Sequence, residues 1–338
     1  MNTKRLLDNK EIISLAKSGS YADAMVHLLN LQREEWGELA KGYNMLESVK
    51  LKTLFFEGFK VELQFNPGRM KSTSAKVDKL SIQNRDCFLC DENLPMEQKG
   101  IALPGNYLIL CNPYPVFPEH FTVVSANHKP QEILTSFHDF LLISSLLGNK
   151  YSLIYNGPKC GASAPDHLHF QAGTKTFMPI ENEFFELKDQ FGELLGENDS
   201  IIMTGINDGL RKLISLESKD KKVLIDIFGK IYEISSRISG NGGEPKMNLI
   251  SKYSTETGWL VIIFLRSKHR SSHYYLKGKK RIIISPAAID LGGICVVPIQ
   301  EDFERIEEEL ISEIYNEVFI SNEAFEYIKS SLKKNFNQ

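Results

Sequence analysis

Hydrophobic and polar residues follow two different periods in the first half of the chain. Over residues 9–36, Leu, Ala and Met recur every three or four positions, and Ser20 lies between two such runs. This spacing predicts two helices with Ser20 as the cap between them. Residues 59–65 alternate at every position and predict a half-exposed strand. Further strands are predicted at 107–111, 120–125, 151–155 and 167–171, and a helix at 130–147.

The second half carries the same two patterns, more weakly at first. A strand near 201–203 and a helix over about 219–238 are predicted before a flexible, glycine-rich loop at 239–244. Strands are then predicted at 247–251, 259–265, 281–284 and 294–297, and helices at 301–316 and 322–334. Helices and strands therefore occur throughout both halves, and the predicted fold class is α+β.

An internal repeat divides the chain. Residues 109–124 align without gaps with residues 282–297, and each segment is predicted to contain a strand, a proline-led loop and a second strand. A duplicated α+β unit explains the match, and chance similarity between short β-rich segments is the alternative. We expect two related half-units with antiparallel sheets packed by helices: a catalytic half at 1–180 and a degenerate copy at 181–338.

The composition narrows the class of protein. The 338 residues are 42% hydrophobic and 25% charged, with a formal net charge of -3, so there is no electrostatic case for nucleic acid or a membrane surface as partner. The N-terminus lacks the apolar core of a signal peptide, and no run of 18 apolar residues occurs. Five cysteines, an odd number, fit a reducing compartment. We expect a soluble cytoplasmic protein, and leave monomer and homodimer as open alternatives.

The stretch Gly-Ala-Ser-Ala-Pro-Asp-His-Leu-His-Phe-Gln at 161–171 carries the most chemistry. Alternation from His167 to Gln171 predicts a strand with His167, His169 and Gln171 on one face. Two imidazoles on a strand after a Gly-Ser loop can serve a metal, a phosphate or both. Taken alone, such a pair is explained equally well as two surface histidines.

A zinc site is predicted from ligands spread along the chain. Cys87 and Cys90 form a Cys-x-x-Cys, and His128 and His167 supply two imidazoles. Two thiolates and two imidazoles make a closed tetrahedral zinc site. The alternative is two buried thiols beside an exposed histidine. A thioredoxin-like redox role is less favoured, because no helix N-terminus clearly follows Cys87.

If His167 binds the metal, His169 remains as a nucleophile. A neutral imidazole attacks phosphorus near pH 7, since its ordinary pKa is about 6.5. Gly161 and Ser163 offer backbone N–H groups and a hydroxyl to phosphate oxygens, and Gln171 can hold a phosphate oxygen or the imidazole.

Basic and polar residues elsewhere complete the predicted substrate site. Arg69 and Lys71 can neutralise phosphate charge, with a solvent-facing turn as the alternative for Arg69. Asn66 and His120 are also expected to bind substrate. A second basic group in the other half comprises Arg266, His269, Arg270 and His273, and an exposed basic loop explains it as well as a phosphate site does.

The motif at 161–171 resembles the active-site motif of the histidine-triad superfamily, in its transferase and phosphorylase branch. That branch includes galactose-1-phosphate uridylyltransferase, diadenosine tetraphosphate phosphorylase and GDP-hexose phosphorylase. The resemblance implies that His169 forms the covalent nucleotidyl intermediate and that Gln171 replaces the third histidine. It also implies zinc at the positions matching those of the uridylyltransferases, namely Cys87, Cys90, His128 and His167. The resemblance is specific over about 66–173 and only architectural beyond.

One residue departs from the family pattern. Asp166 stands between Pro165 and His167, where the uridylyltransferase and diadenosine motifs run directly from proline to histidine. The resemblance still implies a nucleotidyltransferase that cleaves a nucleotide phosphoanhydride, with phosphate or a sugar phosphate as acceptor. The preferred activity is that of an ATP adenylyltransferase, a diadenosine tetraphosphate phosphorylase. The alternatives are a phosphorylase or uridylyltransferase acting on a nucleotide sugar, a non-catalytic nucleotide-binding module and, ranked below transfer, a hydrolase.

Overall fold

A ten-stranded antiparallel sheet forms the centre of the molecule. This computed structural model describes residues 5–74, 77–240 and 243–336. In spatial order the first five strands of the sheet are β3 (Gly100–Leu103), β4 (Tyr107–Cys111), β5 (His120–Ser125), β7 (His169–Thr174) and β6 (Tyr151–Asn156). The other five are β11 (Met247–Ser254), β12 (Gly258–Leu265), β10 (Lys212–Ser218), β9 (Ile201–Asn207) and β8 (Gly192–Asn198). The two sets meet where β6 pairs with β11.

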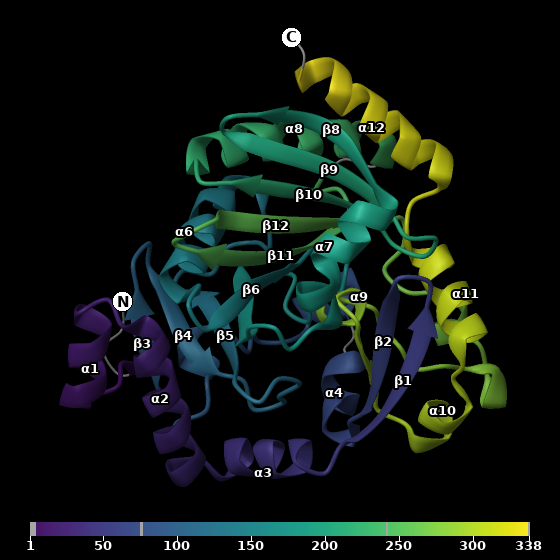
Figure 1. The fold of residues 1–338 in the computed structure, drawn as a ribbon. Helices are drawn as coiled ribbons and strands as arrows, with labels where there is room; N and C mark the ends of the chain where they lie inside the picture. Colours follow the sequence, from purple (N-terminus) through teal and green to yellow (C-terminus); the bar gives the residue numbers. More distant parts are fainter. Residues whose placement is uncertain (1–4, 75–76, 241–242, 337–338) are drawn as a thin grey trace.

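A separate three-stranded sheet lies beside the large one (Figure 1). It consists of β1 (Lys50–Phe56), β2 (Phe59–Phe65) and β13 (Ile294–Val297). The first two strands pair antiparallel, and β13 pairs parallel with β2. This small sheet therefore joins the N-terminal part of the chain to its C-terminal part.

Helices cover the sheets on two sides. The longer ones are α1 (Lys10–Lys17), α2 (Tyr21–Glu35), α3 (Gly37–Leu46), α6 (Phe137–Leu147), α7 (Pro179–Phe191), α8 (Lys221–Ser239), α11 (Glu308–Val318) and α12 (Asn322–Phe336). Short ones are α4 (Met70–Thr73), α5 (Lys79–Gln83), α9 (Ala288–Leu291) and α10 (Gln300–Arg305). One hydrophobic core lies under α2, α6, α8 and α12, and a second lies between the large sheet, α7, α11 and the small sheet.

Two strands of the large sheet, β12 and β7, differ in what lies against their faces. In β12, Ile263 packs in the first core and its neighbours Ile262 and Phe264 pack in the second, so an unbroken apolar run is buried on both faces. In β7, Phe170 packs in the first core, while His169 and Gln171 face the other side and line a cavity. The polar–apolar alternation of β7 thus marks a strand with a cavity on one face.

Much of the sequence-based prediction of elements is confirmed. The helices near 9–36, 219–238 and 322–334 are present, and Ser20 is the N-cap residue of α2. The strands predicted at 59–65, 107–111, 120–125 and 294–297 are also present. The prediction missed the strands β1, β3, β8 and β10, the helices α3 and α7, and the short helices α4, α5 and α9. The fold class, α+β with antiparallel sheets packed by helices, is confirmed, whereas the domain boundary at residue 180 stays a prediction.

Several boundaries and one alignment were wrong. The helix predicted at 130–147 begins at Phe137, and the segment at 301–316 is two helices, broken at residues 306–307. Residues 281–284 form no strand. Consequently the gapless match of 109–124 with 282–297 does not relate equivalent strands: β5 lies in the large sheet, and β13 lies in the small one. Local apolar patterns are alike in both places because a buried strand has the same pattern in either sheet.

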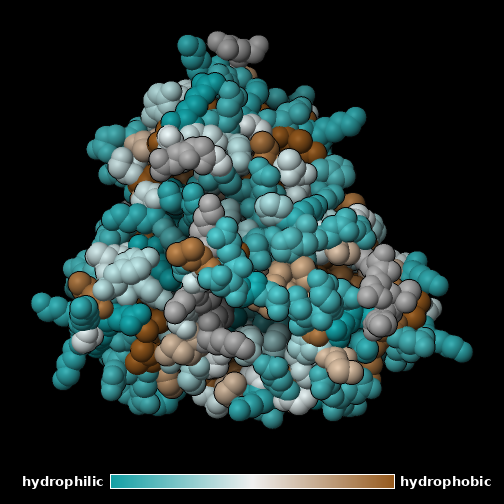
Figure 2. Space-filling model, turned by 180° about the vertical axis from the view of Figure 1, so that it is seen from behind, coloured by the Kyte–Doolittle hydropathy of each residue, from teal (hydrophilic) through white to brown (hydrophobic). Residues whose placement is uncertain are grey.

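The surface is mostly hydrophilic. Figure 2 shows hydrophobic residues on the rear side in small patches separated by hydrophilic ones. Within the described residues, no helix has both the length and the apolar character needed to span a membrane. All five cysteines are free thiols.

Candidate functional site

Four metal-ligating side chains from three segments meet at one point. Cys87 and Cys90 lie in the turn after α5, His128 follows β5, and His167 lies in the turn just before β7. The ligand atoms all lie within 4.8 Å of one another. The Sγ of Cys90 is 3.1 Å from Nδ1 of His128, and the Sγ of Cys87 is 3.3 Å from Nδ1 of His167. His167 thus precedes the strand in which it was predicted.

The ligand types and spacing of the cluster suit a metal ion. Bonds of about 2.3 Å to sulfur and 2.0–2.1 Å to nitrogen separate the ligands of a tetrahedral zinc by roughly 3.3–3.8 Å. The Nε2–H of His167 donates to the carbonyl of Ser125 at 2.7 Å, so Nδ1 keeps its lone pair on the side of the thiols. Without a cation, burial and the neighbouring Cys87 raise the pKa of Cys90 to about 12. A divalent cation would hold both sulfurs as thiolates.

Asp166, the residue that departs from the family pattern, ties the cluster to the histidine motif. Arg85 Nη2 donates to Asp166 Oδ1 at 2.5 Å, and the two side chains are only 24% and 18% exposed. The guanidinium of Arg85 also lies over the ring of Phe88. The ion pair therefore fastens the turn that carries His167 to the segment that carries Cys87.

His169 is a neutral imidazole held in one orientation. Its Nδ1 lies 2.8 Å from the carbonyl oxygen of His167, so Nδ1 carries the proton and Nε2 keeps a lone pair. Burial lowers the pKa of His169 to about 4, and the ring is therefore neutral near pH 7. The side chain lines a cavity of about 600 Å³ on the face of β7 away from α6.

Gln171 is oriented by a buried histidine behind it. The backbone N–H of Val116 donates to Nδ1 of His120 at 3.1 Å, which leaves the proton on Nε2. That Nε2–H donates to Oε1 of Gln171 at 3.2 Å. Burial and the nearby Arg69 lower the pKa of His120 to about 3, so this donor persists at neutral pH. The amide NH₂ of Gln171 is left to donate to a ligand in the cavity.

The large cavity can accept a largely apolar group next to an anionic one. Its volume falls in the range of pockets for small organic ligands, roughly 300–1,000 Å³. Apolar and aromatic side chains line much of it, among them Trp36, Phe88, Leu89, Leu94 and Leu110. Arg69, Ser163, His169 and Gln171 line it as well, and they supply a cation, a hydroxyl, a neutral imidazole and an amide.

Gly161 and Lys71 were also predicted to bind substrate, and Arg69 is fixed at the wall of the large cavity. Gly161 lines a smaller neighbouring cavity, and its φ of +98° together with a contact of 2.6 Å between its would-be Cβ and Ala287 Cβ explains the glycine. Lys71 lies in α4, and its side chain is outside the part that the structure describes. Arg69 is fixed by donating from Nη1 to the carbonyl of Tyr114 at 2.7 Å.

Asn66 and His120, which were predicted to bind substrate, do not line either of these two cavities. Asn66 is 3% exposed, and its Nδ2 donates to Gln64 Oε1 at 3.0 Å and to Pro115 O at 3.1 Å. His120 is fully buried, and both of its ring nitrogens bond to protein atoms. The Nδ2 of Asn66 and both ring nitrogens of His120 therefore support the walls of the site through hydrogen bonds within the protein.

The sequence-based reasoning missed Gln131. This buried side chain accepts a hydrogen bond from the backbone N of His169 at 2.8 Å and donates to its carbonyl at 3.0 Å. It also donates to the carbonyl of Asn156 on β6 at 2.9 Å. Gln131 thus holds the start of β7 in place. No local pattern marks it, because its three partners come from strands distant in sequence.

Two family models match separate parts of the chain. A domain of unknown function, DUF4922, matches residues 28–174, and the GDPGP1-like C-terminal domain matches residues 216–338. The first model includes the whole cysteine–histidine cluster and the motif at 161–171. The second covers most of the half without the motif.

Two curated relatives are similar over part of their length. The chain is 27% identical over 168 residues to diadenosine 5',5'''-P1,P4-tetraphosphate phosphorylase 2 of Saccharomyces cerevisiae, covering 43% of this chain and 48% of the yeast protein. It is 31% identical over 131 residues to galactose-1-phosphate uridylyltransferase of Bacillus subtilis, covering 32% of this chain and 25% of that protein. The alignments therefore span about half and a quarter of the relatives' lengths.

Solved structures resemble the fold across most of the chain. The yeast Ap4A phosphorylase Apa2 in complex with Ap4A has a TM-score of 0.57 at 17% identity, covering 87% of this chain and 97% of that one. The same enzyme in complex with AMP has a TM-score of 0.55 at 16% identity, with 87% and 96% covered. At these identities the likeness establishes the fold.

Proposed function

The chain belongs to the phosphorylase and transferase branch of the histidine-triad superfamily, and we propose that it transfers a nucleotidyl group through His169. The single observation that carries this proposal is the hydrogen bond from Nδ1–H of His169 to the carbonyl of His167. It aims an unprotonated Nε2 at the cavity and is in place to stabilise the positive ring that forms when Nε2 bonds to phosphorus.

In the first step, Nε2 of His169 attacks the α-phosphorus of a bound nucleotide. The new N–P bond forms as the P–O bond to the leaving group breaks, and its electron pair stays on the leaving oxygen. In the second step an oxygen of phosphate attacks the same phosphorus, and the N–P bond breaks to return a neutral imidazole. The products are a nucleoside diphosphate and the released leaving group.

Gln171, Ser163 and Arg69 serve the phosphate during both steps. The NH₂ of Gln171 and the hydroxyl of Ser163 donate to the non-bridging oxygens, where charge develops. The guanidinium of Arg69 offsets the phosphate charge. Because Gln171 is a neutral amide, it cannot act as a general base toward water, which favours transfer over hydrolysis.

Zinc is the metal that we propose for the Cys87–Cys90–His128–His167 cluster. All four positions are filled by protein ligands, as in structural zinc sites, so the ion would supply no open position for substrate. It would join the Cys-x-x-Cys turn to the turn that precedes His169. The proposed role is therefore to hold the nucleophile's strand in position.

The proposed substrate is a dinucleoside polyphosphate that is cleaved with phosphate as acceptor, and a nucleotide sugar is the second candidate. The similarity to the yeast phosphorylase supports the first candidate, and the similarity to the uridylyltransferase supports the second. Both substrates place a base and an α-phosphate in the same cavity and share the first step.

A substrate panel tests the proposal. The protein is incubated with α-³²P-labelled diadenosine tetraphosphate, GDP-sugar or UDP-sugar, and acid-labile, base-stable label on the chain is measured before and after addition of phosphate. We expect label with at least one substrate and its release as nucleoside diphosphate. Binding of all these nucleotides without label or turnover would instead establish a nucleotide-binding module.

A further inference from the structure

A second, smaller cavity adjoins the large one and is lined by both halves of the chain. It has a volume of about 50 Å³ and shares Arg69, Ser163 and Gln171 with the large cavity. The second half contributes Arg270 and Asp290, together with His269, Ser285 and Ala287. A water needs roughly 10–15 Å³ on this scale, so the space suits one tetrahedral oxyanion.

Arg270 is held in one orientation at this cavity. Its Nε donates to Oγ of Ser285 at 2.8 Å, and its Nη2 donates to the carbonyl of Thr73 at 3.2 Å. The guanidinium also lies 4.0 Å from the centroid of the Tyr274 ring. Since Thr73 belongs to the helix that follows Arg69, Arg270 connects the second half directly to the phosphate-binding residues of the first. A guanidinium held in this way loses little entropy when it binds an anion.

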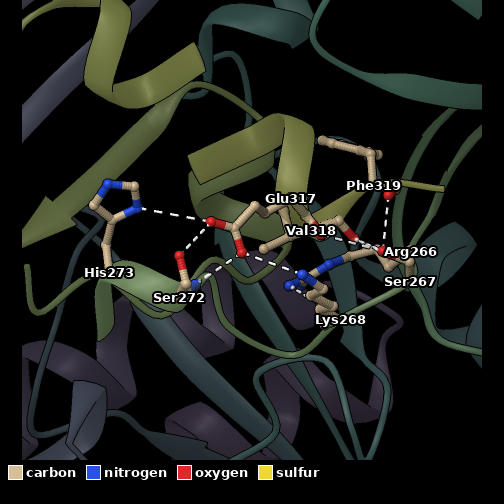
Figure 3. A network of polar contacts seen from close by, with 8 residues as sticks. All are labelled: Arg266, Ser267, Lys268, Ser272, His273, Glu317, Val318 and Phe319. Atoms are coloured by element: carbon tan, nitrogen blue, oxygen red, sulfur yellow. Dashed lines mark hydrogen bonds and ion pairs between the residues drawn. The ribbon is translucent and has the colours of Figure 1, made fainter. Parts of the chain in front are cut away.

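The loop that carries Arg270 is fastened to α11 by a network around Glu317 (Figure 3). Glu317 accepts hydrogen bonds from the backbone N of Ser272 at 2.9 Å and from its Oγ at 2.5 Å, and pairs with Lys268 at 3.2 Å. Ser267 Oγ donates to the carbonyl of Phe319 at 2.8 Å. Although partial burial acts the other way, the bonds from Ser272 and Lys268 keep the pKa of Glu317 below its usual value.

Arg266 fixes the same loop from the inside. Its Nη2 donates to the carbonyls of Lys268 and His269, at 2.9 and 2.8 Å. Its Nη1 donates to the carbonyl of Pro286 at 2.6 Å and to Oδ1 of Asn248 at 2.8 Å. The basic cluster of the second half is therefore an ordered loop beside the cavity, and Arg266 itself is a supporting residue.

The charges around the small cavity favour an anion. Two guanidinium groups, those of Arg69 and Arg270, line it, and Nε of Arg69 is buried with no hydrogen-bond partner among the described residues. The opposing carboxylate is Asp290, whose oxygens accept from the backbone N of Ala287 and Val296. Burial raises the pKa of Asp290 to about 6, and burial with the neighbouring arginines lowers that of His269 to about 3.

We propose that this small cavity binds the phosphate group of the leaving group, which is joined to the α-phosphate by the bond that is cleaved. Arg270 of the second half is the main residue that binds this anion. The inference rests on the proposed nucleotidyl transfer and adds a role for the half without the motif. In the first step the cavity holds the leaving phosphate, and in the second it holds the attacking one. A phosphate oxygen then forms the P–O bond as the P–Nε2 bond of His169 breaks.

Binding of phosphate to the intact chain tests the proposal without turnover. Calorimetric titrations with inorganic phosphate and with glucose 1-phosphate are compared for the wild type, Arg270→Gln and Arg270→Lys. We expect binding of one or both ligands, weakened at least about 10-fold in Arg270→Gln, because a charge-assisted hydrogen bond is lost. The affinity of Arg270→Lys should lie between those of the wild type and Arg270→Gln, since lysine keeps the positive charge and lacks the paired N–H donors of the guanidinium.

Arg281→Gln is the matched control. Arg281 also lies over the Tyr274 ring, at 5.4 Å, and it does not line the small cavity. Its substitution should leave phosphate binding unchanged. Wild-type binding of neither ligand would overturn the proposal, as would equal affinity of wild type and a folded Arg270→Gln.

The labelling reaction distinguishes failure of the phosphate subsite from failure of the proposed nucleotidyl transfer. If His169 is labelled and phosphate releases the label equally fast in wild type and Arg270→Gln, the subsite is refuted and the proposed function stands. If no nucleotide labels His169 and phosphate binding still depends on Arg270, the proposed function is refuted and the anion site stands.

Discussion

His167 and His169 are two residues apart and have opposite roles in the arrangement of the site. His167 donates from Nε2 to the carbonyl of Ser125 and turns Nδ1 toward the thiols of Cys87 and Cys90. His169 donates from Nδ1 to the carbonyl of His167 and leaves Nε2 at the cavity. The same ring presents a different nitrogen in each case.

The difference teaches that backbone carbonyls select the chemistry of a neutral imidazole. A ring with one proton can offer only the nitrogen that does not carry it, so the acceptor behind each histidine decides which lone pair is available. His167 lies in the turn before β7 and His169 in its first residue, which brings different carbonyls within reach. Four predictions test how the site is arranged, in order of the expected effect.

Replacing His169 has the largest expected effect. His169→Gly removes the nucleophile, and nucleotidyl label on the chain should fall more than about 1,000-fold. The control is His27→Ala, at an exposed position on α2, which should label like the wild type. Autoradiography of the denatured chain measures both. Label that persists in His169→Gly would place the nucleophile elsewhere.

Removing a metal ligand has the next largest effect. Purified wild-type protein should contain about one zinc per chain, and Cys90→Ser should lose most of it, with the free energy of unfolding lowered by about 4 kcal/mol. Elemental analysis and urea unfolding measure these quantities. Cys295→Ala removes a buried thiol from the small sheet and should keep the metal. A metal-free wild type with freely alkylated Cys87 and Cys90 would refute the zinc site.

Removing the donor behind Gln171 should slow the reaction more modestly. In His120→Leu the Oε1 of Gln171 loses its partner, and the amide can rotate to face phosphate with its oxygen. The rate of label formation should fall about 100-fold, as it does when one oriented donor is lost. His120→Gln restores an N–H donor and should recover much of the rate. Equal rates in wild type and His120→Leu would show that Gln171 needs no such support.

The smallest effect is on stability at acid pH. The pKa of His120 is about 3 in the folded chain and about 6.5 in an unfolded one, so between these values only the unfolded chain binds the proton. Stability is therefore lost as the pH falls below about 6.5, by up to about 1.4 kcal/mol per pH unit. In His120→Leu this loss disappears. Urea unfolding at pH 7 and pH 5 should show that the free energy of unfolding falls less in His120→Leu than in the wild type. An equal fall in both proteins would contradict the prediction.

The sequence alone determined those features that depend on neighbours along the chain. The alternation of His169, Phe170 and Gln171 predicted a strand with one polar face, because side chains of a strand point to alternate sides. The ligand types at Cys87, Cys90, His128 and His167 predicted a metal cluster, and their atoms do meet. The periodic helices near both ends were also predicted correctly, since an amphipathic helix repeats its pattern over many residues.

Only the tertiary structure decided which atoms of these residues face each other. The support of Gln131 for His169, and the hydrogen bond from His120 to Gln171, depend on strands that pair across the sheet. Likewise Arg270 and Arg69 line the same small cavity because the second half packs against α4, the helix that follows β2. Such contacts leave no local period in the sequence, since each joins residues dozens to hundreds of positions apart. The motif at 161–171 could therefore be found by reading the chain, whereas the proton positions on its two histidines required the fold.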